Sequence, residues 1–311
     1  MPATESRLAG IGGVFIAAMV WGTTGTAATF APALSPLAVG AVAMGVGGLL
    51  QGAIALAAIR RQRRLMARQW RYLLTGALAV ALYPLAFYTS MRFAGVTVGT
   101  VISIGSAPLF SALIEYRLDG LRLTKQWLLG ATVGLLGMIL LCFAERGEQG
   151  AGGEAGLAPI GILLGLLAGF TYALYSWSAR RLMQRKLAPR AAMGATFGAG
   201  GLLLMPVLWL TGAPLFTAWH NAAVGLYMAL VPMFIGYICY GYGLARISAS
   251  TATTITLLEP VVAALLAVLL VGERLPLSGW GGVALIILCL AIITLPAEKL
   301  ALRARRQPDG G

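Results

Sequence analysis

Ten apolar runs, each long enough to cross a bilayer, dominate this sequence and restrict what it can fold into. A membrane-spanning helix needs about 20 mostly apolar residues, and short polar or charged connections separate the runs here. Of the 311 residues, 59% are hydrophobic and only 11% are charged, unlike a soluble domain. We therefore expect an all-α integral membrane protein with ten transmembrane helices, at residues 8–30, 36–59, 72–91, 96–116, 126–143, 159–179, 191–211, 222–243, 250–271 and 277–295.

The basic residues favour one orientation of these helices. If the N-terminus lies in the cytoplasm, 20 of the 23 Lys and Arg residues fall in cytoplasmic segments, and only Arg92, Arg146 and Arg274 fall outside. Such an excess is typical of cytoplasmic loops. The formal net charge of +13 is then explained by topology, so nucleic acid is not an expected partner. We expect a monomer in the bacterial inner membrane, in contact with its lipids, with both termini cytoplasmic.

The two halves of the chain repeat each other weakly. Residues 103–123 align with residues 255–275 at an offset of 152, which pairs Pro108 with Pro260. Span 1 also matches span 6, since Trp21 and Tyr172 correspond at an offset of 151. Because each repeat has five spans, an odd number, the second copy must enter the membrane from the opposite side. We divide the chain into a first five-helix repeat (1–150) and an inverted second repeat with a basic tail (151–311), as in secondary transporters.

Several short motifs carry a resemblance to a known family. They are Trp21-Gly22 near the end of span 1, Ala173-Leu174-Tyr175 in span 6, ARISASTAT before span 9, and LEP followed by a terminal GERL in span 9. With these motifs and its ten spans, the chain resembles the EamA type of the drug/metabolite transporter superfamily over essentially its whole length. Within that superfamily it also looks like the bacterial exporters of aromatic and other neutral amino acids.

The resemblance implies a function as well as a fold. A chain of this type is expected to be a secondary transporter without a cofactor, which exports small neutral or zwitterionic metabolites, foremost amino acids, by alternating access. Two alternatives stay open: a flippase of lipids or lipid-linked sugars, and an exporter of other drugs or metabolites. A flippase would be expected to hold basic residues for a phosphate, and the central part of every span lacks Lys and Arg.

The resemblance also implies a central cavity lined mainly by spans 1, 3, 4, 6, 8 and 9. Aromatic residues in these spans offer apolar area with a polar handle, which suits an amphipathic small molecule. Tyr88, Trp177 and Tyr242 lie close to span ends, where a place in the interfacial belt or in packing is favoured. Ser and Thr in spans 4 and 9 either present hydroxyls to a zwitterion or let helices pack closely. The predicted substrate-binding residues are Trp21, Tyr83, Phe87, Ser103, Ser106, Tyr172, Tyr175, Tyr237, Tyr240 and Thr256.

Two prolines and one carboxylate are candidates for gating or coupling. Pro108 and Pro260 each remove a backbone hydrogen bond, which predicts a broken helix in both repeats and free carbonyls on Ile104 and Thr256. Glu259 lies next to Pro260 at bilayer depth, where an ionisable side chain costs roughly 2.5–3.5 kcal/mol and marks a functional site by default. It has no counterpart in the first repeat. Three roles stay open for it: contact with a substrate ammonium group, proton coupling, or a hydrogen bond between helices.

Enzymatic chemistry has little support in the sequence. It contains no HExxH, GxSxG or Walker motif, and its one histidine, His220, lies at the end of span 8. The three cysteines all lie inside apolar runs without a CxxC pattern, so neither disulfides nor a metal site is expected. We therefore expect a transporter and not an enzyme, with no catalytic residue and no metal ligand.

Overall fold

The computed structural model describes residues 3–149, 156–271 and 275–294. Nearly all of these residues are helical, and none of them forms a strand. Nine helices in these ranges are long and apolar enough to cross a membrane, and a shorter apolar segment, Lys125–Leu141, supplies the tenth span. The predicted all-α membrane fold is confirmed. The Gly272-Glu273-Arg274 end of span 9 and the basic tail lie outside the described residues.

Several of the ten spans are built from more than one helical piece. In the first repeat, span 1 consists of α1 (Ala3–Trp21) and α2 (Thr24–Thr29). Span 2 consists of α3 (Pro36–Gly40), the π-helical η1 (Ala41–Val46) and α4 (Gly47–Arg68). Spans 3 to 5 are α5 (Trp70–Ala94), α6 (Val96–Asp119) and α7 (Lys125–Gln149).

The second repeat has the same order of spans. Spans 6 and 7 are α8 (Ala158–Gln184) and α9 (Pro189–Thr211), and a short 3₁₀ turn, η2 (Ala213–Phe216), follows. Span 8 consists of α10 (Trp219–Met228), the π-helical η3 (Ala229–Ile235) and α11 (Gly236–Leu244). Span 9 consists of α12 (Ala249–Ile255), α13 (Leu258–Leu266) and the π-helical η4 (Ala267–Val271), and span 10 is α14 (Leu277–Thr294).

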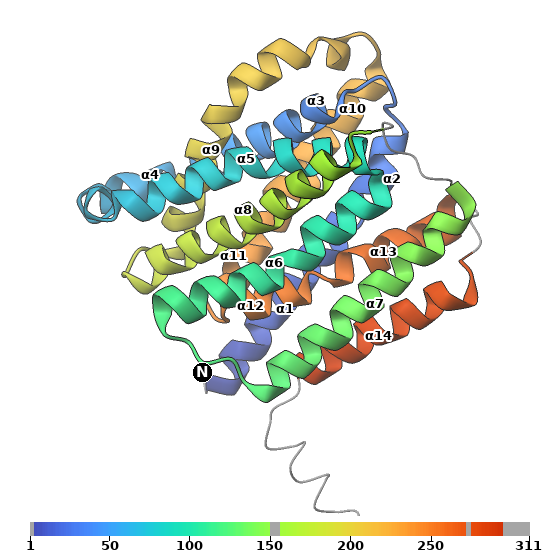
Figure 1. The fold of residues 1–311 in the computed structure, drawn as a ribbon. Helices are drawn as coiled ribbons and strands as arrows, with labels where there is room; N and C mark the ends of the chain where they lie inside the picture. The colour runs from blue at the N-terminus through green and yellow to red at the C-terminus, as the bar shows by residue number, and fades with distance from the viewer. Residues whose placement is uncertain (1–2, 150–155, 272–274, 295–311) are drawn as a thin grey trace, which may run out of the picture.

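The most extensive helix contacts join the two halves of the chain. Helix α4 packs on α9 and α7 on α14, so spans 2 and 5 each meet their own counterpart in the other repeat. Helix α5 (span 3) packs on α8 (span 6), and α1 (span 1) packs on α11 (span 8). Because spans 3 and 8 are counterparts in the repeat, as are spans 1 and 6, these two contacts are equivalent to each other. In Figure 1, α4 with α9 and α7 with α14 lie on opposite flanks of the bundle. The halves are therefore interleaved about a pseudo-twofold relation, as inverted repeats require.

Glycines allow these contacts to be close. A Cβ atom on Gly198 would lie 3.0 Å from the Cα atom of Gly52, where α9 crosses α4. A Cβ atom on Gly137 would lie 2.8 Å from the carbonyl oxygen of Gly282, where α7 crosses α14. Because lipid gives helices no hydrophobic reason to associate, such close backbone contact is a main source of attraction between them.

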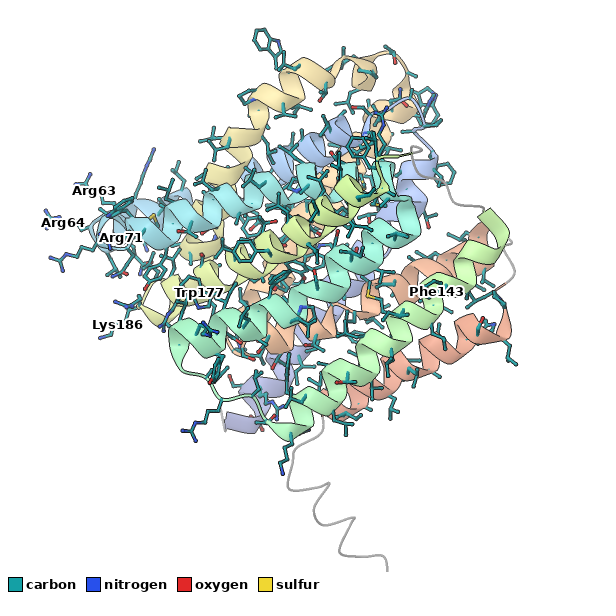
Figure 2. The ribbon with its side chains drawn as sticks, viewed as in Figure 1. Arg63, Arg64, Arg71, Phe143, Trp177 and Lys186 are labelled. Carbon is teal, nitrogen blue, oxygen red and sulfur yellow. The ribbon has the colours of Figure 1, made fainter. Side chains whose placement is uncertain are left out.

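The outer surface of the bundle is apolar, and one end is basic. Large side chains such as those of Leu129 and Phe143 are more than half exposed, as expected for residues that face lipid. Basic side chains gather where α4 ends, α5 begins and α8 ends, and this region is called the basic end below. Figure 2 shows Arg63, Arg64, Arg71 and Lys186 together there.

The break predicted in span 9 is present. Helix α12 ends at Ile255 and α13 begins at Leu258, so the helix is interrupted at Thr256, four residues before Pro260. The Thr256 carbonyl is not free, however, because the amide of Glu259 donates to it at 3.0 Å. A tighter turn thus takes up the hydrogen bond that the proline removes.

The matching break predicted in span 4 is absent. Helix α6 continues through Pro108, along a side that packs against α8. Tertiary packing of this kind can outweigh the local cost of a proline. Span 1 is interrupted instead, at Gly22 and Thr23 between α1 and α2. The two broken helices are therefore spans 1 and 9, which are not counterparts in the repeat.

Candidate functional site

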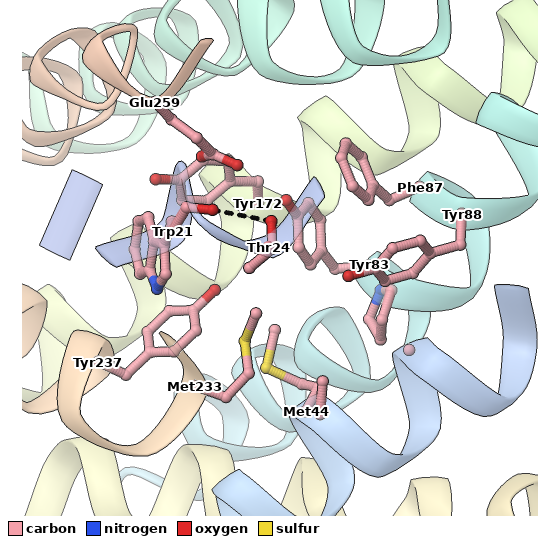
Figure 3. Close-up of a pocket in the computed structure, with 13 residues that line it drawn as sticks. Trp21, Thr24, Met44, Tyr83, Phe87, Tyr88, Tyr172, Met233, Tyr237 and Glu259 are labelled. Atoms are coloured by element: carbon pink, nitrogen blue, oxygen red, sulfur yellow. Dashed lines mark hydrogen bonds between the residues drawn. The ribbon is translucent and has the colours of Figure 1, made fainter. Parts of the chain in front are cut away.

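A pocket lies inside the helix bundle, and six of the ten spans contribute to its wall (Figure 3). Span 4, which was expected in the wall, supplies none of the described lining residues, whereas span 2 supplies three. The lining residues are Trp21, Thr24, Gly40, Ala43, Met44, Tyr83, Pro84, Phe87, Tyr88, Tyr172, Met233, Tyr237 and Glu259.

The pocket lies at the middle of the membrane-spanning segments. Tyr83 and Tyr172 each lie one residue past the midpoint of their spans, Trp70–Ala94 and Ala158–Gln184. Glu259 lies at the midpoint of Ala249–Leu270. A central position between two inverted repeats is where secondary transporters bind their substrates.

Irregular backbone surrounds this pocket. Trp21 is the last residue of α1 before the break in span 1, and Glu259 follows the break in span 9. Met44 and Met233 come from the π-helical segments η1 and η3. Inside a membrane, broken and π-helical backbone is tolerated where it is buried in protein or lines a cavity. The backbone departs from α-helix where side chains from both repeats meet.

Aromatic rings form most of the wall. The ring centroids of Trp21 and Tyr172, which are counterparts in the repeat, lie 6.4 Å apart and meet edge to face. The Trp21 ring also lies 4.7 Å from that of Tyr237. Tyr83 stacks on Phe87 at 5.6 Å and lies 5.5 Å from Tyr172. Five of the predicted aromatic residues, Trp21, Tyr83, Phe87, Tyr172 and Tyr237, thus converge on the pocket.

A second layer of polar groups holds these rings in place. Tyr175, Tyr240 and Thr256 were predicted to bind substrate, but they lie behind the wall and are fully buried. Their bonds fix the orientation of the lining residues. The Trp21 Nε1 atom donates to the Pro232 carbonyl at 2.8 Å, and the Tyr172 hydroxyl donates to Thr256 Oγ1 at 3.0 Å. The hydroxyls of Tyr175 and Tyr237 are hydrogen-bonded to each other at 2.7 Å, as are those of Ser176 and Tyr240 at 2.8 Å.

Three polar groups in the described part of the pocket wall have no hydrogen bond or ion pair that holds them in place. Within the described ranges, neither the Tyr83 nor the Tyr88 hydroxyl has a hydrogen-bond partner, and the Glu259 carboxylate has neither a hydrogen bond nor an ion pair. All three line the pocket. Tyr88 was interpreted as an interface or packing residue, and the structure places it in the wall instead. Unpaired polar groups in an aromatic pocket are available to a ligand.

Ser103 and Ser106 do not reach the pocket wall. The Ser106 hydroxyl is bonded to the Ser103 carbonyl at 3.4 Å within α6, and the Ser103 side chain is fully buried. Both face Gly169 of α8, where a Cβ atom would lie 2.7 Å from the Ser103 carbonyl oxygen. Their place is the close contact between α6 and α8, which is the packing alternative. Neither Pro108 nor Pro260 lines the pocket.

A buried carboxylate that was not among the predicted site residues joins two spans near the basic end. Glu115 of α6 is 1% exposed. Its two oxygens accept hydrogen bonds from the Ala249 amide at 2.7 Å, and from the Ser250 amide at 3.1 Å and hydroxyl at 2.5 Å. Arg180 Nε lies 3.9 Å away, and Arg180 also donates to the Leu244 carbonyl. The sequence feature that could have indicated this role is the presence of an acidic residue inside the predicted span 96–116.

A second acidic residue continues this contact one helical turn further. Asp119 of α6 pairs with Arg181 at 2.8 Å and accepts a hydrogen bond from Trp177 Nε1 at 3.0 Å. Trp177 is therefore a buried packing residue and not part of an exposed belt. Together, Glu115, Asp119, Arg180 and Arg181 tie α6 to α8, and through Ser250 to the start of span 9. We call these four residues the basic-end lock.

Comparison with known proteins agrees with this architecture. The model of the EamA-like transporter family matches the chain twice, at residues 8–143 and at residues 159–295. Each match covers one of the two sets of five spans. A solved crystal structure superposes with a TM-score of 0.77 over 95% of this chain and 98% of the other, at 22% sequence identity, which supports the fold.

Relatives over most of the chain are named as transporters. The transporter YwfM of Bacillus subtilis is 33% identical over 289 residues, covering 92% of this chain and 94% of YwfM. A protein of Streptantibioticus cattleyicolor named as a probable terminal-alkyne amino-acid exporter is 27% identical over 268 residues, covering 83% of this chain and 86% of that protein. Both matches are long enough to extend over both halves of the chain.

Proposed function

Because this chain belongs to the EamA-like transporter family, we propose that it exports small neutral or zwitterionic metabolites, foremost amino acids, by alternating access. It is a multi-pass membrane transporter and not an enzyme. The observation that carries the narrower proposal is the central pocket, where an aromatic wall surrounds one carboxylate and two unpaired hydroxyls. These groups complement an amino acid, which has an ammonium group, a carboxylate and a side chain.

The arrangement of donors and acceptors supports this ligand class. The Glu259 carboxylate can accept from an ammonium group, and the hydroxyls of Tyr83 and Tyr88 can donate to a carboxylate. The rings of Trp21, Phe87 and Tyr172 offer apolar surface for the rest of the molecule. The relative named as an amino-acid exporter gives the same proposal independent support.

The closed basic end supports alternating access. Glu115 binds α6 to the start of α12, so a substrate can pass that end only after these contacts open. We place the basic end and both termini in the cytoplasm of a bacterial cell, since Lys and Arg accumulate on that side of an inner-membrane protein. We propose that these contacts form the cytoplasmic closure of the transporter and that it acts as a monomer.

Transport of a lipid or a lipid-linked sugar has less support. A phosphate headgroup would need Lys, Arg or several aligned amide donors. None of the thirteen described lining residues is Lys or Arg. The same pocket leaves open other small metabolites with an amine and an apolar body.

The direct test uses the purified chain in liposomes. Vesicles preloaded with unlabelled amino acid are given labelled phenylalanine, leucine or glutamate outside, with and without a pH gradient. We expect counterflow of the neutral amino acids and none of glutamate, because a second negative charge would face Glu259. Translocation of a fluorescent lipid without movement of any amino acid would replace the proposal by the flippase alternative.

A further inference from the structure

Among the residues that the structure describes, the Glu259 carboxylate has no cationic partner. The ion pairs of Arg180 and Arg181 are formed with Glu115 and Asp119 at the basic end. No hydroxyl or amide in these ranges donates to Glu259, although the tyrosine rings around it carry hydroxyls. An unpaired carboxylate in the middle of a membrane protein is costly, and a ligand that brings a positive charge would offset that cost.

The rings around Glu259 favour the same charge. Trp21, Tyr83, Tyr172 and Tyr237 line the pocket together with the carboxylate (Figure 3). The face of an aromatic ring carries negative electrostatic potential and attracts an ammonium group that lies within about 6 Å of the ring centroid. A carboxylate combined with several ring faces therefore forms a site for an organic cation.

The backbone fixes Glu259 and Trp21 next to each other. A Cβ atom on Gly22 would lie 2.8 Å from the Glu259 carbonyl oxygen and 2.5 Å from the Val262 Cβ atom. The segment that carries Trp21 thus packs directly on α13. The indole is held in turn by its bond to the Pro232 carbonyl, which leaves its ring and not its N–H group to the pocket. The fold itself therefore holds the Trp21 ring and the Glu259 carboxylate together.

The described part of the pocket wall offers a ligand carboxylate no positive charge. Among the described lining residues, the polar donors are neutral hydroxyls. Those of Tyr83 and Tyr88 are unpaired, whereas those of Thr24, Tyr172 and Tyr237 already form hydrogen bonds. Such hydroxyls can donate to a carboxylate but bring no positive charge, whereas Glu259 would meet an ammonium group with the opposite charge. The pocket therefore discriminates strongly for an ammonium group and only weakly for a carboxylate.

We propose that the pocket selects its ligands by their ammonium group, which Glu259 binds. Arylalkyl amines without a carboxylate are therefore ligands of the same site. The inference rests on the proposed function, because it concerns the same pocket. It extends that function from amino acids to their decarboxylated counterparts. Met44 and Met233 adapt the floor of the pocket to either molecule, since methionine side chains are flexible and polarisable.

Three ligands that share a phenyl group separate the contributions. Phenylalanine has both charged groups, 2-phenylethylamine has only the ammonium group, and 3-phenylpropionate has only the carboxylate. Their affinities for the purified full chain in lipid nanodiscs are measured by isothermal titration calorimetry at one pH and salt concentration. We expect phenylethylamine to bind within about threefold of phenylalanine, and phenylpropionate to bind at least tenfold more weakly than either, a difference of about 1.4 kcal/mol.

Glu259→Gln then tests the carboxylate itself, since glutamine keeps the shape and a hydrogen-bond acceptor but not the charge. We expect at least tenfold weaker binding of phenylethylamine and little change for phenylpropionate. Glu5→Gln, at an exposed position, is the matched control. Glu259→Asp retains the charge and is expected to retain preference for the amine, which keeps the test informative if the glutamine variant folds poorly.

The outcomes for this inference and for the proposed function are distinct. Transport of labelled phenylalanine without binding or competition by phenylethylamine overturns the inference and leaves amino-acid export standing. Equal binding of phenylpropionate and phenylethylamine also overturns it. Transport of phenylethylamine without transport of phenylalanine supports the inference and removes the amino-acid proposal. If neither compound binds or moves, both proposals fail.

Discussion

Ser250, the second residue of α12, donates both its amide and its hydroxyl to the carboxylate of Glu115 at the far end of α6, at 3.1 and 2.5 Å. The two residues belong to different repeats and to the two spans that carry the matching prolines. This contact joins α6 to α12 near the basic end, while the pocket lies at the middle of the spans. One carboxylate thus joins two helices and another, Glu259, lines the pocket, although both are acidic residues in apolar helices.

Glu115→Gln should weaken the closure of the basic end. The glutamine amide cannot accept from both backbone amides, and an unsatisfied buried donor costs about 1–3 kcal/mol. We expect a lower melting temperature and faster hydrogen exchange of the amides of Ala249 and Ser250, measured by mass spectrometry on peptides of α12. Glu5→Gln is the control. Unchanged exchange in α12 would show that Glu115 does not hold this end.

Asp119→Asn should have a much smaller effect than Glu115→Gln. The pair of Asp119 with Arg181 is partly exposed, and such ion pairs contribute about 0–1 kcal/mol. Asparagine can still accept from Trp177. The melting temperature should change by no more than a few degrees in the same assay. A loss as large as that of the Glu115 variant would mean that the lock acts as one charged network.

Trp21→Ala should abolish transport at normal expression, because it removes the ring that contacts both Tyr172 and Tyr237 and lies beside Glu259. Trp209→Ala removes the same side chain from an exposed position far from the pocket, where the ring is 86% exposed, and should leave transport near the wild-type rate. The counterflow assay compares the two variants. Wild-type rates with Trp21→Ala would place substrate binding elsewhere.

Tyr172→Phe and Tyr172→Ala should differ sharply. Phenylalanine keeps the ring and loses one hydrogen bond to Thr256, which costs about 1 kcal/mol. We expect transport within several-fold of the wild type. Alanine removes a ring that is in contact with Trp21 and Tyr83 and should abolish transport. The same counterflow assay, with Tyr116→Phe as an exposed control, measures both. An equal loss of transport in both Tyr172 variants would show that transport depends on the Tyr172 hydroxyl and not on its ring.

Gly22→Ala should impair the protein, whereas Gly25→Ala should not. A Cβ atom on Gly22 would lie 2.5 Å from that of Val262, so α13 must move, and overpacking of this kind typically costs about 1–3 kcal/mol. A Cβ atom on Gly25 would meet nothing within 4 Å. Thermal unfolding and counterflow should separate the two variants. Equal behaviour would show that span 1 can shift without loss.

The repeat was the most useful guide to the pocket. It paired Trp21 with Tyr172, and these rings are in contact. It failed for Pro108, because matching prolines do not force matching breaks when one helix is packed along its length. It also gave no sign of the break at Gly22. Equivalent sequence positions predict equivalent places in the fold, but the local backbone depends on neighbours that differ between the two copies.

Helical periodicity gave little help with the individual faces. In a soluble protein the apolar face of a helix marks the core, but in a membrane both lipid and core are apolar. Ser103 and Ser106 were therefore placed in the cavity, while Tyr88, Met44 and Met233 were not. A polar residue in such a helix can serve close packing as well as a ligand. Only the neighbours of each side chain separate these roles.

The sequence by itself determined the class of the molecule: ten apolar spans, two copies of a five-span unit and one carboxylate at bilayer depth. These follow from the length and polarity of single segments, which the bilayer restricts strongly. The tertiary structure alone decided which faces meet, that Tyr175 and Tyr240 lie behind the wall, and that Glu115 binds the start of α12. Such contacts join residues more than 60 positions apart, and their geometry depends on how helices from both repeats cross, which no single segment encodes.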